Sequence, residues 1–286
     1  MKKLFCFIVF CFSASHSFAQ NEARFGVFAG VAQTSLYNSK DAAFGDYLPT
    51  FKPTIGVTAG YHFTLFKRMP IGFSAQLASN KMGQNYYGDY ADSSRFYAYS
   101  RLNYIRPGAA LHFGSNPRRI FSVEASVGAT YGFLTSYHER YELTRYRQDK
   151  FILDIKDNDV IYNDTTLMRG TTSNKLYNAT DMNMFGAISF NFLFTRNFIF
   201  GIQIRHDFGS NDVENKTPNK INFDTKPVTS TNFLPYQMDV KFRGPVDPNA
   251  VRAVTVNRST GIFLSLKYRL YNPEKIEFWY REHKWD

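Results

Sequence analysis

The chain has 286 residues, of which 34 are Lys or Arg and 24 are Asp or Glu, so its formal charge is +10. Hydrophobic residues make up 44% of the sequence and charged residues 20%, a balance that excludes a disordered chain. After the N-terminal segment, no apolar run approaches the roughly 18 residues of a membrane helix, which excludes a helical membrane protein. The 29 Phe and 19 Tyr residues, against 2 Trp, favour β-strands with an amphipathic surface.

The first 19 residues have the pattern of a secretory signal peptide. A Lys pair is followed by the apolar residues 4–12, and Ser17-Phe18-Ala19 places small residues at the two positions that signal peptidase recognises. We therefore expect residues 1–19 to be removed after Ala19 and the mature protein to be exported. Both cysteines of the chain lie in this segment, so we expect a mature chain without disulfides.

Apolar residues alternate with small or polar residues along most of the mature chain, as in a strand with one apolar face. A soluble β-sandwich also alternates, but here the apolar face is nearly pure and the opposite face is small, as in a narrow membrane barrel. Each segment is close to the roughly 9–11 residues that cross a bilayer at a tilt. The sequence therefore predicts an all-β fold, an eight-stranded antiparallel transmembrane β-barrel, with strands near 25–32, 54–65, 71–78, 105–113, 121–133, 184–195, 198–207 and 262–270.

The connections between these segments alternate between long and short. Short turns are expected near 66–68, 115–118 and 196–197, and long loops at 37–51, 80–95, 137–181 and 209–257. Outer-membrane barrels have short periplasmic turns and longer extracellular loops. We therefore expect a barrel domain over residues 20–271 in the bacterial outer membrane, with both termini periplasmic and residues 272–286 forming a periplasmic tail.

Part of this pattern resembles a known family. Leu102-Asn103-Tyr104-Ile105-Arg106-Pro107, followed by Leu111-His112-Phe113-Gly114, resembles a strand of the PorT-like outer-membrane β-barrel family of Bacteroidetes. Residues 124–134, 183–209 and 262–270 are similar to the strands that follow it. The chain departs from the family in its long loops 137–181 and 209–257, in Arg106 directly before the proline, and in the tail. The resemblance implies this fold, an outer-membrane location and a link to type IX secretion, although most members have no assigned activity.

Several charged side chains fall on the predicted inward face. An eight-stranded lumen is barely wide enough for side chains, and buried charges must be paired. Glu124 and Arg106 lie on adjacent predicted strands, as do Arg205 and Lys267, so we expect ion pairs that plug the lumen. An ion path, and hence a small pore, is the alternative. The expected network consists of Arg106, Glu124, Arg205, Asp207, Lys267 and Arg269.

A possible catalytic pair lies at the outer end of one strand. Ser136 and His138 are two residues apart, so they share a face, as a hydroxyl nucleophile and its base require. This pattern keeps a lipid-modifying enzyme open as a hypothesis. However, the alternation of the preceding strand points both side chains inward, away from lipid.

Two clusters in the predicted loop 137–181 could bind ions. Asp154, Asp157, Asp159 and Asp164 lack the glycine of an EF-hand loop, and the alternation around Asp157-Asn158-Asp159 predicts a hairpin with a polar turn instead. Basic residues stand just above the predicted outer interface, where they could contact lipopolysaccharide phosphates. These residues are Arg140, Arg145, Arg147 and Lys150.

We interpret the sequence as a non-enzymatic outer-membrane protein. It presents loops 137–181 and 209–257 to an envelope or secretion-related partner, with outer-membrane lipid, including lipopolysaccharide, as its surroundings. A lipid-modifying enzyme and a small pore are the alternatives. The sequence contains no phosphate loop, zinc spacing or Rossmann pattern, so we expect no cofactor, and the exported barrel makes nucleic acid an unexpected partner.

Overall fold

A computed structural model describes residues 22–38, 46–65, 69–89, 95–115, 120–144, 150–163, 167–195, 197–215, 221–224 and 254–271. The predicted signal peptide and C-terminal tail lie outside these ranges. The described residues form 13 β-strands and no helix. Within them, therefore, no helix is long and apolar enough to cross a membrane.

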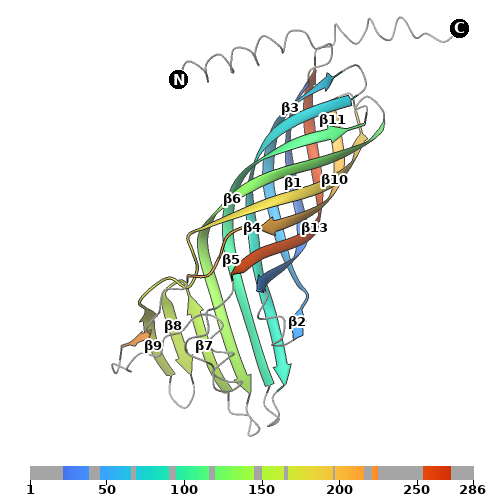
Figure 1. Ribbon diagram of the computed structural model, residues 1–286. Coiled ribbons are helices and arrows are strands. Elements are labelled where there is room, and N and C mark those ends of the chain that lie inside the picture. The colour runs from blue at the N-terminus through green and yellow to red at the C-terminus, as the bar shows by residue number, and fades with distance from the viewer. Residues whose placement is uncertain are drawn as a thin grey trace, which may run out of the picture.

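Eight of the strands close into an antiparallel barrel (Figure 1). Around the barrel their order is β1-β3-β4-β5-β6-β10-β11-β13, and β13 pairs with β1 to close the ring. Each predicted segment of alternation overlaps one of these strands, so the predicted fold class is confirmed. The strands are β1 (Glu22–Asn38), β3 (Thr50–Leu65), β4 (Met69–Asp89), β5 (Arg95–Gly114), β6 (Phe121–Thr144), β10 (Thr180–Leu193), β11 (Phe198–Gly209) and β13 (Thr255–Tyr271).

The barrel strands are longer than a bilayer requires. β4, β5 and β6 have 21, 20 and 24 residues. The expectation that residues 80–95 form a loop is wrong, because β4 continues to Asp89 and pairs with β5 as far as Arg95. The short strand β2 (Asp46–Leu48) pairs with β4 in this extension. Beyond the bilayer, ladder hydrogen bonds between neighbouring strands satisfy backbone groups that a loop would leave to water.

The prediction of a long loop over 137–181 is wrong for the same reason. β6 continues to Thr144, and the sheet then extends through β7 (Lys150–Lys156), β8 (Asp159–Asn163), β9 (Leu167–Thr172) and β12 (Ile221–Phe223). Figure 1 shows these strands beyond one end of the barrel. We call this the long-strand end, and the opposite end, where β1 begins and β13 ends, the short-turn end.

The predicted hairpin around Asp157 is confirmed. Ile155 pairs with Val160 and Lys156 with Asp159, which leaves Asp157 and Asn158 in the turn. Asp157 has a φ of 54°, a left-handed conformation that Asp tolerates better than most residues because its short side chain can bond locally.

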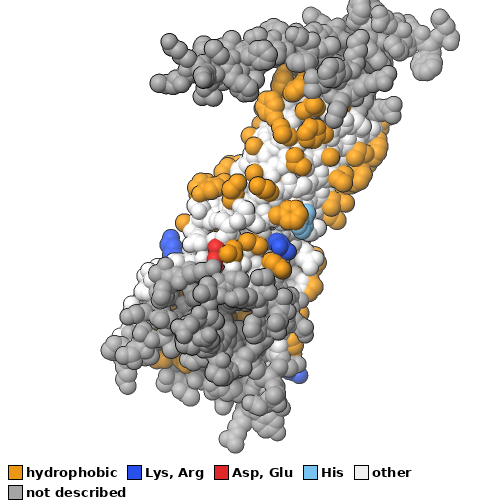
Figure 2. Space-filling model, viewed as in Figure 1, with side chains coloured by type: hydrophobic (Ala, Val, Ile, Leu, Met, Phe, Trp, Pro, Cys, Tyr) orange, Lys and Arg blue, Asp and Glu red, His pale blue; other side chains and the backbone are white. Residues whose placement is uncertain are grey.

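The outer surface of the barrel is apolar. On β6 the outward side chains of Phe121, Val127 and Phe133 are 46%, 54% and 48% exposed. Figure 2 shows hydrophobic side chains distributed over the barrel wall, with the charged ones of this view near the long-strand end. From Phe121 to Phe133 the strand rises about 40 Å, or about 28 Å across a bilayer at a tilt of about 45°. This apolar belt therefore matches a hydrocarbon core of roughly 30 Å.

A buried apolar core lies at the long-strand end. The inner faces of β7 and β8 contribute Leu153, Ile155 and Val160, which pack with residues of β4, β5 and β6. The segments 173–179 and 210–215 close over this core with Leu176, Tyr177 and Val213, all of them at most 1% exposed. The extension is therefore a packed structure and not an open rim.

Candidate functional site

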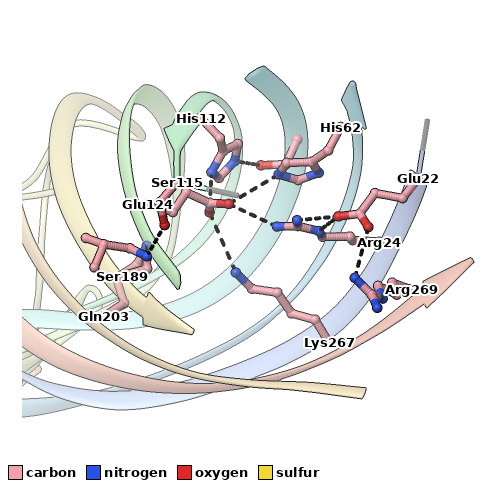
Figure 3. A network of polar contacts seen from close by, with 12 residues as sticks. Glu22, Arg24, His62, His112, Ser115, Glu124, Ser189, Gln203, Lys267 and Arg269 are labelled. Carbon is pink, nitrogen blue, oxygen red and sulfur yellow. Dashed lines mark hydrogen bonds and ion pairs between the residues drawn. The ribbon is translucent and has the colours of Figure 1, made fainter. Parts of the chain in front are cut away.

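Glu124 on β6 is the centre of a charged network in the lumen near the short-turn end (Figure 3). The Arg24 Nη1 atom donates a hydrogen bond to Glu124 Oε2 at 2.9 Å, and Lys267 Nζ lies 3.9 Å from Oε1. His112 Nδ1 lies 2.9 Å from Oε1 and His62 Nε2 lies 3.4 Å from Oε2. One carboxylate is thus surrounded by groups from β1, β3, β5 and β13 and joins both sides of the barrel.

The network continues to the rim of the lumen. Arg24 also contacts Glu22, and Arg269 Nη1 lies 3.4 Å from Glu22 Oε2. Positive and negative groups therefore alternate in a chain from Arg269 to Glu22, Arg24, Glu124 and Lys267. Each of these side chains is at most 12% exposed, and such burial requires charges to be paired.

Arg106 belongs to a separate group nearer the long-strand end. Its guanidinium contacts the fully buried carboxylate of Asp181, which also accepts hydrogen bonds of 2.7 Å from Asn183 and from Asn257. The expected contact between Arg106 and Glu124 is therefore wrong. Glu124 is opposite Gly114, eight residues from Arg106 on the same strand, which is about 27 Å along β5.

Arg205 also departs from the expectation. It bonds Asp207, with Nη2 2.7 Å from Oδ1, and its guanidinium lies 3.7 Å from the centroid of the Phe185 ring. It is opposite Gly261 on β13, six residues before Lys267, so the expected Arg205–Lys267 pair is wrong. The six predicted lumen residues are all part of polar networks, but these networks lie at three levels of the lumen.

Some of the most connected members of these networks were not predicted from the sequence. Glu22 and Arg24 precede the predicted first strand, yet they have the same parity as the inward Gly26 and Phe28. Asp181 precedes the predicted strand near 184–195, because residues 137–181 were expected to form a loop. In both cases the alternation extends beyond the chosen boundary, and following it outward would have identified these residues.

The two histidines beside Glu124 have a ligand-like arrangement. One donor atom from each of His62, His112 and Glu124 lies within 4.8 Å of the others, a spacing that a divalent metal can bridge. However, Arg24 and Lys267 contact the same carboxylate, and their positive charges oppose a second cation there. The geometry therefore supports charge pairing across the lumen more than metal binding.

A β-bulge at Thr135 reverses the two faces of β6. Asn103 pairs with Ser136 but Tyr104 pairs with Leu134, so Thr135 is an extra residue. Even-numbered residues such as Glu124 are buried before the bulge, whereas odd-numbered ones such as Glu139 are buried after it. The expectation that Ser136 and His138 point inward is therefore wrong.

Ser136 and His138, the possible catalytic pair, also contact different residues. Ser136 Oγ accepts a hydrogen bond of 2.7 Å from Asn103 Nδ2. His138 is on the outer surface, where its Nε2 lies 2.7 Å from Asp154 Oδ1 and its ring packs edge-on against Tyr99. Neither side chain uses the other as its partner, so the geometry does not support a nucleophile and base here.

Glu139 takes the inward position instead and is completely buried in the core at the long-strand end. Ser100 Oγ and Tyr141 OH donate hydrogen bonds to its carboxylate at 3.0 and 2.9 Å, and Tyr177 OH donates another. Burial raises the pKa of Glu139 to about 7; these hydrogen bonds oppose the shift, and the nearby Glu214 adds to it. A carboxyl group that titrates near neutral pH is thus enclosed in the extension, outside the apolar belt.

The acidic residues around Asp157 do not assemble into an ion site. Asp154 bonds His138 and lies 3.5 Å from Arg140, while Asp157 Oδ1 accepts a hydrogen bond from the Tyr137 backbone. These two carboxylates therefore have separate protein partners and do not form the suggested calcium cluster, whose member Asp164 lies outside the described residues.

The basic residues that could contact lipid phosphates either have an acidic partner or lie outside the described residues. Arg140 Nη2 and Lys150 Nζ lie 3.4 and 3.1 Å from the carboxylate of Glu142, so both cations already have an acidic partner. Arg145 and Arg147 lie outside the described residues.

No protein-family model and no curated protein matches the chain. Among solved structures, it is similar to a major outer membrane protein of Thermus thermophilus, with 13% identity, coverage of 87% of this chain and 99% of that one, and a TM-score of 0.39. The outer membrane protein OprG of Pseudomonas aeruginosa has 9% identity, coverage of 88% and 97%, and a TM-score of 0.35. The attachment invasion locus protein Ail of Yersinia pestis has 10% identity, coverage of 87% and 99%, and a TM-score of 0.30. Likenesses this weak carry no inference about activity, ligands or partners.

Proposed function

We propose that this protein is a non-enzymatic bacterial outer-membrane β-barrel that presents the sheet at its long-strand end to a protein partner of the cell envelope. The observation that carries this proposal is the packed extension itself. β6 to β9 and β12 form a continuous sheet beyond the apolar belt, with a buried core on one face and an exposed opposite face. Such a sheet can offer a defined surface in a way that flexible loops cannot.

The location follows from the architecture. A closed ring leaves no unpaired sheet edge in lipid, and an apolar belt of bilayer thickness surrounds it. Outer-membrane barrels place short turns in the periplasm and longer segments outside. By this rule the long-strand end is extracellular, and the strands that begin and end the barrel, β1 and β13, open to the periplasm.

The alternatives have less support. The lumen is crossed by the Glu124 network, by Arg205 stacked on Phe185, and by the group around Asp181, which favours a filled barrel over a pore. The Ser136 and His138 side chains bond other residues, which removes the geometric basis for a lipid-modifying enzyme.

The family resemblance supports a particular kind of partner. The motif from Leu102 to Gly114, with the segments similar to the strands that follow it, resembles PorT-like barrels, so the partner we propose is a component of a type IX secretion assembly or a related envelope complex. The proposal concerns the exposed face of the extension, where Ile161 on β8 and Leu167 on β9 are 43% and 61% exposed.

Site-specific photo-crosslinking in the native host tests the proposal. A crosslinking amino acid at Ile161 or Leu167 should yield a discrete adduct that mass spectrometry identifies as one envelope protein. The matched control is Ile55, which is also apolar and 63% exposed but belongs to the apolar belt of β3, and it should give no protein adduct. Absence of adducts at both extension positions, or the same adducts at Ile55, would contradict the proposal.

A further inference from the structure

The outer face of β4 and β5 changes from apolar to positively charged at one level. Leu77 and Ile105 are 49% and 47% exposed in the apolar belt, and the next charged outward residues are Lys81 and Arg101, both exposed. Lys81 pairs with Asn103 and Gly83 pairs with Arg101. The two cations are therefore diagonal neighbours on the same face of adjacent strands, a separation that long side chains can bridge.

These cations lack acidic partners within the described part of the chain. Arg101 lies over the Tyr99 ring, 4.2 Å from its centroid, and no described carboxylate contacts Lys81 or Arg101. Arg140 and Lys150, by contrast, both contact Glu142. An added anion beside Lys81 and Arg101 would therefore relieve their repulsion without displacing a protein carboxylate.

The position of Lys81 and Arg101 along the bilayer normal indicates which anion they meet. Lys81 is four residues beyond Leu77, which is about 14 Å along the strand and about 10 Å along the bilayer normal at a tilt of about 45°. Headgroups occupy the layer between the hydrocarbon core of roughly 30 Å and the full bilayer of roughly 40–45 Å. Phosphate groups of membrane lipids lie in that layer, and the planar guanidinium of Arg101 can bind two phosphate oxygens at once.

We propose that Lys81 and Arg101 form a binding site for the phosphate group of a glycolipid in the outer leaflet. Arg101 would hold the phosphate with two hydrogen bonds, and the ammonium group of Lys81 would supply charge from the neighbouring strand. The site faces lipid and is independent of the partner proposed for the extension, because crosslinking at Ile161 and lipid binding at Lys81 can succeed or fail separately.

Binding of lipid A to the full-length protein in detergent micelles tests this site. Native mass spectrometry should detect bound diphosphorylated lipid A, with an affinity at least about tenfold lower for the double variant Lys81→Gln/Arg101→Gln, since charge-assisted hydrogen bonds are lost. Arg101→Lys keeps the charge but not the bidentate geometry, so it should weaken binding less. The affinity of the wild type for fully dephosphorylated lipid A should be no higher than the affinity of the double variant for diphosphorylated lipid A.

The matched control removes two charges from the same outer surface, on strands two and four places along the sheet from β5. Lys156→Gln/Arg169→Gln changes exposed residues of β7 and β9 and should leave lipid A binding within about twofold of wild type. A heat-dependent shift in gel mobility verifies that each variant is folded. Equal losses in both double variants, or none in either, would overturn the proposal. Competition by inorganic pyrophosphate as effective as that by lipid A would overturn the assignment to a glycolipid and indicate free phosphate.

Discussion

The buried carboxyl group of Glu139 should make the extension at the long-strand end less stable as the pH rises. Its folded-state pKa of about 7 lies above the ordinary value of 4.5, a difference of about 2.5 units. The stabilising contribution is complete below pH 4.5 and is lost as the pH rises through 7. At about 1.4 kcal/mol per unit, the loss amounts to about 3 kcal/mol.

Hydrogen–deuterium exchange of the segment 173–179 measures this loss directly, because Tyr177 covers Glu139. After correction for intrinsic exchange, protection in the wild type should fall by about 100-fold between pH 5 and pH 8. Glu139→Gln cannot ionise, so its protection should be nearly constant over this range and exceed that of the wild type at pH 8.

A control on the outer face of the same strand separates this effect from general charge effects. Glu142 contacts Lys150 at the surface, and these contacts lower its pKa, so Glu142→Gln should leave the pH dependence of segment 173–179 unchanged. The reasoning would be refuted if the wild type and Glu139→Gln lost protection equally with rising pH.

Four further outcomes are expected. Glu124→Gln should lower stability by about 3–5 kcal/mol, because the cations around it lose their partner, and an unchanged thermal midpoint in the gel-mobility assay would count against the lumen network. Gly72→Ala should destabilise the barrel by about 1–3 kcal/mol, because a Cβ there would overlap the His62 ring, and adding His62→Ala should recover part of the loss. A cysteine at Asn158, in the β7–β8 turn, should label in intact cells, whereas a cysteine at Asn116, in a predicted periplasmic turn, should label only after permeabilisation. The purified protein should show no stable conductance steps in a planar bilayer, and reproducible ion-selective steps would instead indicate an open lumen.

Alternation along the chain was sufficient to predict the barrel. Residues such as Phe121, Val127 and Phe133 alternate with Glu124 and Ser126, and the structure places the first set outside and the second inside. The turn at Asp157 was equally accessible, because a polar turn between two alternating segments is a local signal. Both features depend on neighbouring residues only.

The contacts inside the lumen were not accessible in this way. Parity assigned Arg106 and Glu124 correctly to the inner face but left their levels open, and the register between β5 and β6 places them about 27 Å apart along the strand. Their true partners are Asp181 for Arg106 and Arg24 for Glu124. Parity does not tell which inward residues of the other strands lie closest to each of them.

The sequence by itself determined which side chains face lipid and which face the lumen over each strand, because the period of two is a property of the extended backbone. Only the tertiary structure decided where that rule changes. The register between β5 and β6 shifts by one extra residue at Thr135, and this bulge turns Glu139 inward and His138 outward. The extension through β7, β8 and β9 has the same origin, since cross-strand hydrogen bonds between distant segments determine where a strand ends.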